Sequence, residues 1–493
     1  MAGVGFELKK LFTARTAAGH IKAYSYSAII TAGPFALMTS MVLGVQLWYS
    51  YLQLPSEITQ IFTAAVVYAF VFSQILTSGF TMVITRYVAD SLSIGRYQDI
   101  MTSLFGISAV FAVIGSIAAG IFFYDKPLPL TTKILSYLFL IQLMLTWAQS
   151  VYLSAIKRYE RLLFSYAAGV VTSIGLAGFF LAYTAISPEQ AGLLAIDIGM
   201  ALIVLLFFLN IVAYYGMGKT GMNFAFLVYF ERHWRLFFIS ASYTLGLFLP
   251  NILIWLGPWG VTVADTFRYA PVYDVLTFYA FLSILPLMML FVVSVETNFY
   301  ERYAVYFSYI TGKGSFRAID DARKDLLHTL WFELRHIVEF QLVFTLIALA
   351  LGNYALSWSG ITYDQVNMYN ILLLAAFFTG LLQLIYILLI YFDCQKDALK
   401  ISLLYFGGNL VLGFIGLKYF GPASYGFTFF IIATISFLTG FVKLSKFGKR
   451  INYYVFCSQP VFYNPVQGFL TRLVKRIYKE RYVDLEQARG DNQ

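Results

Sequence analysis

Twelve long apolar runs constrain this chain more than any other feature of its 493 residues. Most of them reach the roughly 20 residues that an α-helix needs to cross a bilayer core about 30 Å thick. Only 12% of the residues are charged, whereas soluble proteins carry about 25%. We therefore predict an all-α polytopic membrane protein with about twelve transmembrane helices. The runs cover residues 24–50, 61–85, 102–124, 134–156, 162–186, 191–215, 236–257, 275–297, 336–352, 368–392, 399–417 and 424–445.

Lysine and arginine are distributed unevenly among the loops that join these runs. If both termini lie in the cytoplasm, 30 of the 34 basic residues fall in the terminal segments and the inner loops. The outer loops then hold only Lys126, Lys133, Arg268 and Lys418. Because basic residues are retained on the cytoplasmic side of membrane proteins, the sequence predicts that both termini are cytoplasmic.

Twelve runs divide into two sets of six, which predicts two six-helix lobes. The N-terminal lobe covers 1–215 and includes an interfacial N-terminal helix, and the C-terminal lobe covers 236–447. A cytoplasmic linker, 216–235, joins the lobes, and 448–493 form a basic cytoplasmic tail. The two lobes are expected to be parallel repeats, related by an axis along the membrane normal.

The first run of each lobe contains an interior proline, Pro34 and Pro250. Proline removes a backbone hydrogen bond, and membrane helices tolerate the resulting bend where the freed carbonyl finds another partner. Each proline is therefore a candidate hinge for alternating access. A static kink is the alternative.

Amphipathic stretches lie outside the apolar runs. The inner loop 298–335 has the pattern of a surface helix, and the tail contains the basic stretch GFLTRLVKRIYKERYVDL. Such a stretch either lies on anionic lipid or docks a partner protein, and the sequence does not choose between the two. The partner-docking candidates are Phe6, Glu7, Arg472, Lys475 and Arg476.

The sequence contains no motif that would make the chain an enzyme or an ATP-driven pump. It lacks an Asp-x-Asp sugar-nucleotide site, and Thr311-Gly312-Lys313-Gly314-Ser315 lacks the first glycine of a phosphate-binding loop. The four histidines are scattered, and Cys394 and Cys457 lie beside basic segments that we place in the cytoplasm. We therefore expect no catalytic residue, cofactor, metal site or disulfide. A passage through the membrane is favoured.

Polar residues inside the runs are candidates for the walls of such a passage. Asp197 is the clearest, because a charge costs about 2.5–3.5 kcal/mol at the centre of a membrane helix. Neutral sugars are bound by aromatic stacking with amide and hydroxyl hydrogen bonds, which adds uncharged residues. Hydrogen bonding between helices is the alternative role for each residue. The substrate-pathway candidates are Asp197, Glu339, Gln341, Gln142, Trp147, Gln149, Gln74, Asn251, Gln383 and Asn409.

Three motifs resemble the PelG family of Pel exopolysaccharide transporters. They are the opening decapeptide MAGVGFELKK, the segment Ala32-Gly33-Pro34 on the first run, and Thr85-Arg86-Tyr87-Val88-Ala89-Asp90 after the second. The family more often has Ile at position 4, Arg at position 9 and Ser before the Gly-Pro pair, and these differences are conservative. Length, twelve runs and the absence of a soluble domain extend the resemblance over the whole chain.

The resemblance implies the fold of the multidrug/oligosaccharidyl-lipid/polysaccharide (MOP) exporter superfamily in a bacterial cytoplasmic membrane. It implies export of a nascent, N-acetylgalactosamine-rich polysaccharide. The partners that it implies are a cytosolic glycosyltransferase and membrane subunits, one of which senses cyclic di-GMP. The alternatives are a cation-coupled exporter of small molecules or lipid-linked oligosaccharides, and a scaffold of the synthase complex that does not transport.

Overall fold

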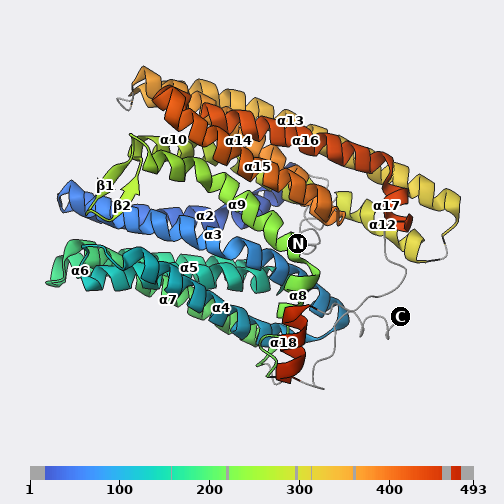
Figure 1. Ribbon diagram of the computed structural model, residues 1–493, viewed down its shortest axis with the longest axis horizontal. Coiled ribbons are helices and arrows are strands. Elements are labelled where there is room, and N and C mark those ends of the chain that lie inside the picture. Colours follow the sequence, from blue (N-terminus) through green and yellow to red (C-terminus); the bar gives the residue numbers. More distant parts are fainter. Residues whose placement is uncertain are drawn as a thin grey trace. The chain divides into compact units, whose positions relative to one another are not determined.

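The computed structural model describes residues 17–156, 158–217, 221–294, 298–312, 314–358, 362–457 and 468–478 (Figure 1). Within these residues, twelve segments are long and apolar enough to cross a membrane, which confirms the predicted number. The segments are Tyr26–Tyr51, Ser56–Ile94, Tyr97–Phe123, Leu130–Ile156, Tyr159–Tyr183, Pro188–Tyr215, Trp234–Leu256, Pro271–Ser294, Phe316–Tyr354, Tyr363–Tyr391, Gln395–Phe420 and Phe427–Lys449.

In the described part of the chain, the secondary structure is helical apart from one short hairpin. The helices are α2 (Ala17–Tyr51), α3 (Ser56–Ile94), α4 (Tyr97–Phe123), α5 (Leu130–Ile156), α6 (Tyr159–Tyr183), α7 (Pro188–Tyr215), α8 (Leu227–Arg232), α9 (Trp234–Leu256), α10 (Pro271–Leu282), α11 (Leu285–Ser294), α12 (Tyr300–Thr311), α13 (Phe316–Trp358), α14 (Tyr363–Tyr391), α15 (Gln395–Ile415), η2 (Gly416–Phe420), η3 (Gly421–Ser424), α16 (Phe427–Lys449), α17 (Ile451–Cys457) and α18 (Phe469–Tyr478). Strands β1 (Val261–Val263) and β2 (Phe267–Tyr269) pair antiparallel.

The chain divides into two compact units. Unit 1 comprises Met1–Gly33, Leu249–Trp259 and Ala270–Gln459, and unit 2 comprises Pro34–Phe248, Gly260–Tyr269 and Pro460–Gln493. The chain passes from one unit to the other directly before Pro34 and directly before Leu249, which precedes Pro250. Both candidate hinges therefore lie where the chain leaves one unit for the other. The predicted lobes 1–215 and 236–447 stay a prediction.

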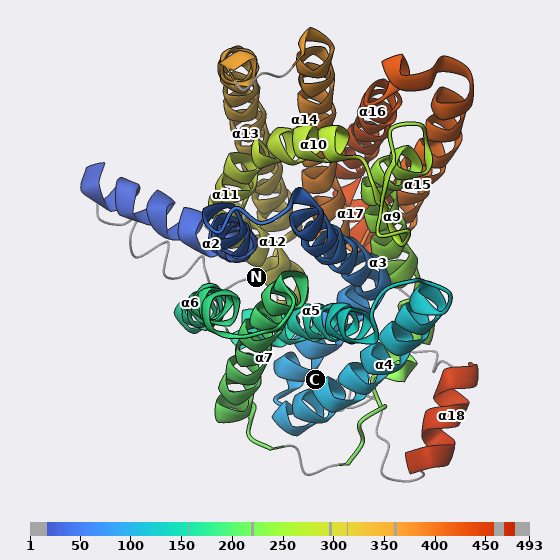
Figure 2. The same ribbon diagram turned by 90° about the vertical axis from the view of Figure 1, so that its left-hand side faces the viewer.

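In unit 2, α7 packs against α6 and α5, and α5 packs against α3 (Figure 2). Two glycines allow α6 and α7 to approach closely, since a Cβ at Gly199 would lie 2.5 Å from the carbonyl oxygen of Gly169. Small residues at such crossings let membrane helices associate through backbone contact. In unit 1, α14 packs against three helices, α16, α10 and α13.

The eighth predicted run, 275–297, is not one helix. Helix α10 ends at Leu282 and α11 begins at Leu285, because Pro286 has no N–H to bond the carbonyl oxygen of Leu282. The side-chain amide of Gln341, on α13, donates a hydrogen bond to the carbonyl oxygen of Ser283 at this break (2.9 Å). The side chain of Gln341 therefore stabilises the interruption.

The prediction of a separate surface helix over 298–335 was wrong in its second half. Helix α12 is separate, but α13 runs without a break from Phe316 to Trp358. Its charged first half is stabilised by ion pairs one turn apart, such as that between Lys324 and Asp320 (2.9 Å). Its second half is apolar enough to span. A change in hydropathy therefore did not mark the end of a helix.

Candidate functional site

A hollow of about 380 Å³ lies in unit 2, at the end where α2 turns into α3. We call it the α2–α3 hollow. None of its lining residues is charged, and hydroxyl groups predominate among their polar groups. The lining consists of Tyr49, Ser50, Leu54, Ser56, Thr59, Gln60, Thr63 and Tyr269. Ligand pockets generally measure about 300–1,000 Å³, so the hollow has room for a sugar residue.

The α2–α3 hollow is built on a short, fixed turn. Gln53 takes the left-handed conformation (φ 51°), and the N–H of Leu54 bonds the carbonyl oxygen of Tyr49 (3.1 Å). The hydroxyl of Tyr49 donates to the carbonyl oxygen of Pro188 (3.0 Å), which holds the buried ring against α7. Gly192 leaves space for that hydroxyl, since a Cβ there would clash with it. The shape of the hollow is therefore set before any ligand binds.

The other wall of the hollow comes from the β1–β2 hairpin. The hydroxyl of Tyr68, on α3, donates to the carbonyl oxygen of Arg268 (2.7 Å) and accepts from its N–H (2.9 Å). This pair of hydrogen bonds fixes β2 on α3 one residue before Tyr269. The hairpin thus positions an aromatic ring over a polar helix face.

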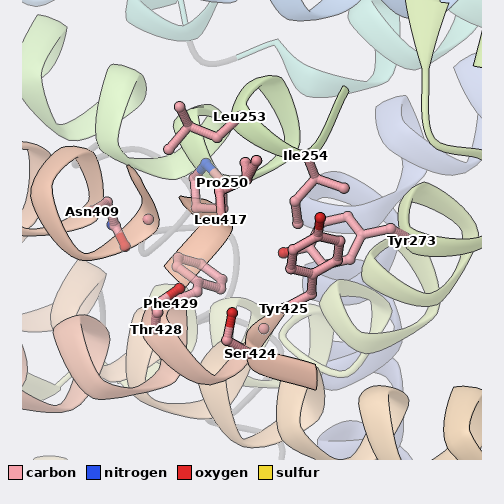
Figure 3. A pocket seen from close by; sticks show the side chains of 12 residues that line it. Pro250, Leu253, Ile254, Tyr273, Asn409, Leu417, Ser424, Tyr425, Thr428 and Phe429 are labelled. Carbon is pink, nitrogen blue, oxygen red and sulfur yellow. The ribbon is translucent and has the colours of Figure 1, made fainter. Parts of the chain in front are cut away.

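A second polar and aromatic pocket lies in unit 1, beside Pro250 (Figure 3). We call it the Pro250 pocket. Its free space is only about 20 Å³, which is enough for about one water molecule. Asn409 is buried in its wall, and the buried hydroxyl of Tyr425 has no partner among the described residues. The lining consists of Pro250, Leu253, Ile254, Tyr273, Asn409, Gly413, Leu417, Ser424, Tyr425, Gly426, Thr428 and Phe429.

One carboxylate joins α9 to α10 beside this pocket. Asp274 accepts hydrogen bonds from the amide of Asn251 (2.8 Å), the indole of Trp255 (2.9 Å) and the backbone N–H of Ala270 (3.1 Å). Asn251 was predicted to line the substrate pathway, whereas its amide nitrogen is used in this helix-to-helix bond. Asp274 was missed, because an acidic residue in the first turn of a helix is ordinary.

The unit 2 candidates on α5 and α7 include several unpaired polar atoms. Asp197 is buried, and neither of its carboxylate oxygens has a hydrogen-bond partner among the described residues. The side-chain carbonyl oxygens of Gln142 and Gln149 are likewise buried and unpaired within that part of the chain. Trp147 instead donates to the hydroxyl of Ser73 (3.0 Å), and Gln74 is half-buried on α3. Buried polar atoms without a protein partner commonly mark sites of water or ions.

The remaining unit 1 candidates are dispersed. Gln341 is fully buried at the α10–α11 break, while Glu339 is exposed and pairs with Arg335 one turn away (2.7 Å). Gln383 is half-buried on α14. Of the predicted residues, only Asn409 and Pro250 are brought together in a described pocket. A pathway or hinge role stays a prediction for every one of these residues.

The docking candidates fall into two groups. Phe6 and Glu7 lie outside the described residues. Arg472, Lys475 and Arg476 are exposed on α18, which packs against α8 in unit 2 (Figure 1). Glu231 was not predicted from the sequence, and its carboxylate accepts hydrogen bonds from the first turn of α18. Within the described residues, no group of three or more His, Cys, Asp or Glu could hold a metal ion.

Comparison with known proteins adds a family and a fold. The PelG family, described as "Putative exopolysaccharide Exporter (EPS-E)", matches residues 1–456. Among curated protein sequences, none matches.

Solved transporters share the architecture at low sequence identity. A MOP superfamily transporter from Pyrococcus furiosus is 12% identical, with a TM-score of 0.58 over 86% of this chain and 96% of its own. An outward-facing multidrug resistance MATE family transporter is 13% identical, with a TM-score of 0.57 over 86% and 96%. A variant of the Vibrio cholerae MATE transporter VcmN is 12% identical, with a TM-score of 0.57 over 87% and 100%. These similarities establish the MOP fold.

Proposed function

The chain belongs to the PelG family of exopolysaccharide exporters, and on that premise we propose that it moves a nascent, largely neutral polysaccharide out of the cytoplasm. The family and fold are those of a transporter and not of an enzyme. The finer proposal is a polymer rich in N-acetylgalactosamine, crossing a bacterial cytoplasmic membrane. A cytosolic glycosyltransferase and membrane subunits, one of them sensing cyclic di-GMP, would supply it.

The observation that carries this proposal is the lining of the α2–α3 hollow. Serine, threonine and glutamine supply donors and acceptors for hydroxyl and acetamido groups, and two buried tyrosines, Tyr49 and Tyr269, border these polar side chains. The lining has no fixed charge, which suits a neutral polymer. If both termini are cytoplasmic, this end of α2 faces outward, so the hollow would receive sugars as they leave.

A cysteine block tests both the export and the hollow. We would replace Cys394 by Ala and Cys457 by Ser, add Gln60→Cys, and express the variant in polymer-producing cells that lack the native gene. A bulky, membrane-impermeant maleimide should then lower secreted polymer by about tenfold, because it fills the space that a sugar would occupy. Glu57→Cys is the matched control, since Glu57 is exposed on the same turn of α3 but does not line the hollow.

The outcomes separate two failures. If cells without the gene still secrete polymer, the export function is wrong. If secretion depends on the gene but the labelled Gln60→Cys variant secretes normally, only the role of the hollow is wrong.

Asp197 favours a second candidate, cation-coupled efflux of small molecules. A buried carboxylate whose two oxygens have no partner is costly unless a proton or a cation occupies it. If efflux is the function, the chain should raise the tolerance of a sensitive host to cationic dyes and Asp197→Asn should abolish that gain. Unchanged dye tolerance, with normal polymer secretion by the Asp197→Asn variant, would exclude this role.

A further inference from the structure

Helix α18 is held at both ends by the segment that precedes α9. At its first turn, the carboxylate of Glu231 accepts hydrogen bonds from the N–H of Leu470, the N–H of Thr471 (3.1 Å) and the hydroxyl of Thr471 (2.6 Å). At its last residue, the hydroxyl of Tyr478 accepts from the N–H of Phe224 (3.1 Å). A carboxylate at this position complements the free N–H groups and the positive end of a helix. The helix therefore has one defined orientation in unit 2.

The orientation fixes which face of α18 points inward. Thr471 and Val474 are buried, and Tyr478 lies one turn beyond them on the same face. These residues form the inward face of α18. Phe469, Arg472, Lys475, Arg476 and Ile477 are exposed on the rest of the helix surface.

The outward surface of α18 carries two adjacent rows. One row is apolar, with Phe469, Leu473 and Ile477 spaced four residues apart, and Phe469 and Ile477 are 70% and 52% exposed. The other row is basic and consists of Arg472, Lys475 and Arg476, all exposed. The helix contains no acidic residue. An apolar row flanked by basic side chains is the pattern of helices that lie in a membrane interface.

The place of α18 in unit 2 agrees with such an interface. Helix α8, on which α18 is held, packs on the last turns of α3, where the hydroxyl of Tyr229 donates to Asp90 (3.3 Å). Arg86 and Arg96 lie at the same end of α3, which we assign to the cytoplasm. Figures 1 and 2 both show α18 running across the axes of the unit 2 spans and not along them. A helix in this position lies parallel to the bilayer surface.

We propose that the outward face of α18 binds anionic phospholipid headgroups of the cytoplasmic leaflet. Phe469 and Ile477 enter the boundary between headgroups and acyl chains, and Arg472, Lys475 and Arg476 pair with lipid phosphates. The positive charge of the helix complements the negative surface of that leaflet. This inference does not depend on the exported substrate.

The test places a fluorescent probe on the apolar row of the full-length chain. Ile477→Cys, in a chain carrying Cys394→Ala and Cys457→Ser, would be labelled with an environment-sensitive dye and reconstituted in nanodiscs. The discs would contain phosphatidylcholine alone or a mixture with phosphatidylglycerol. We expect a blue-shifted emission, quenched by spin-labelled lipid, only in the anionic discs. The same dye on Tyr453→Cys, an exposed residue of α17, is the control and should not respond.

The combined variant Arg472→Gln, Lys475→Gln and Arg476→Gln should lose this response. Because each basic residue near an anionic surface favours binding, loss of all three should lower the equilibrium constant for lipid binding by α18 about a hundredfold. All three side chains are exposed, and an unchanged melting temperature would show that the variant is folded. An equal shift in neutral discs, or a shift that requires an added protein, would overturn the proposal.

Discussion

The α2–α3 hollow and the Pro250 pocket are lined by the same kinds of side chain but differ about twentyfold in free space, 380 against 20 Å³. Each has two tyrosines, serine and threonine hydroxyls, and one side-chain amide. The lining of the Pro250 pocket also contains large apolar side chains, including Leu253, Leu417 and Phe429. Similar polar side chains therefore suit both pockets to neutral polar ligands. The packing of the neighbouring side chains decides whether a sugar or only a water molecule fits.

The two native thiols of unit 1 differ in burial and give the largest expected contrast, since Cys394 is partly buried in the turn before α15 and Cys457 is exposed at the end of α17. Burial, followed by the charges of Asp397 and Asp393, raises the pKa of Cys394 to about 12. Because maleimides react with the thiolate, only about one Cys394 thiol in ten thousand is reactive at pH 8. Cys457 is exposed and should be labelled at least about a thousandfold faster.

The labelling rate of Cys394 should increase with pH. Below the raised pKa, the rate of Cys394 labelling should rise about tenfold for each pH unit between 7 and 9. The variant Cys457→Ser isolates Cys394, and mass spectrometry of the intact chain measures both rates. Comparable labelling of the two thiols at pH 7 would show that the turn between α14 and α15 does not shield Cys394 from the reagent.

Removal of the carboxylate beside the Pro250 pocket should have the next largest effect. Asp274→Ala leaves the donors of Asn251, Trp255 and Ala270 without their acceptor. Each unsatisfied donor costs about 1–3 kcal/mol, so the free energy of unfolding should fall by about 3 kcal/mol or more. Thermal unfolding in detergent measures the loss. Asp321→Ala, which removes a carboxylate that is 65% exposed, should leave stability unchanged.

The fold was largely predictable because the bilayer imposes a length and an apolar composition on each spanning helix. Hydropathy alone did not reveal the break at Pro286 or the continuity of α13, since backbone hydrogen bonding decides both. The site was less predictable. Ser56, Thr59 and Gln60 are ordinary polar residues at the end of a span, and the hydrogen bonds of Tyr68 to Arg268, which place Tyr269 in the same lining, link positions 200 residues apart. Asn251 was recognised, but its acceptor Asp274 lies 23 residues away.

Engineered thiols compare the two pockets directly. In a chain with Cys394→Ala and Cys457→Ser, the Gln60→Cys thiol should react with a bulky maleimide about 30-fold faster than the Ser424→Cys thiol, because only the α2–α3 hollow admits the reagent. With small methanethiosulfonates, the two labelling rates should differ less, because a small reagent needs less space. Equal rates with the bulky reagent would mean that the Pro250 pocket opens as readily as the hollow, and its small volume would then have no functional meaning.

The smallest expected effect concerns the hairpin that completes the hollow. Tyr68→Phe removes one hydroxyl that makes two hydrogen bonds to the backbone of Arg268. The loss should lower the free energy of unfolding by about 1–2 kcal/mol. It should also loosen Tyr269, so labelling of the Gln60→Cys thiol should change by about threefold while labelling of the Ser424→Cys thiol stays constant.

Tyr124→Phe is the matched control for this change, because Tyr124 is 90% exposed and its hydroxyl makes no contact that shapes the hollow. If Tyr68→Phe alters both thiols equally, the hydroxyl acts on the stability of the whole chain. If it alters only the Gln60→Cys thiol, β2 is a wall of the hollow in its own right, and the hairpin is the element through which the size of the hollow can be tuned.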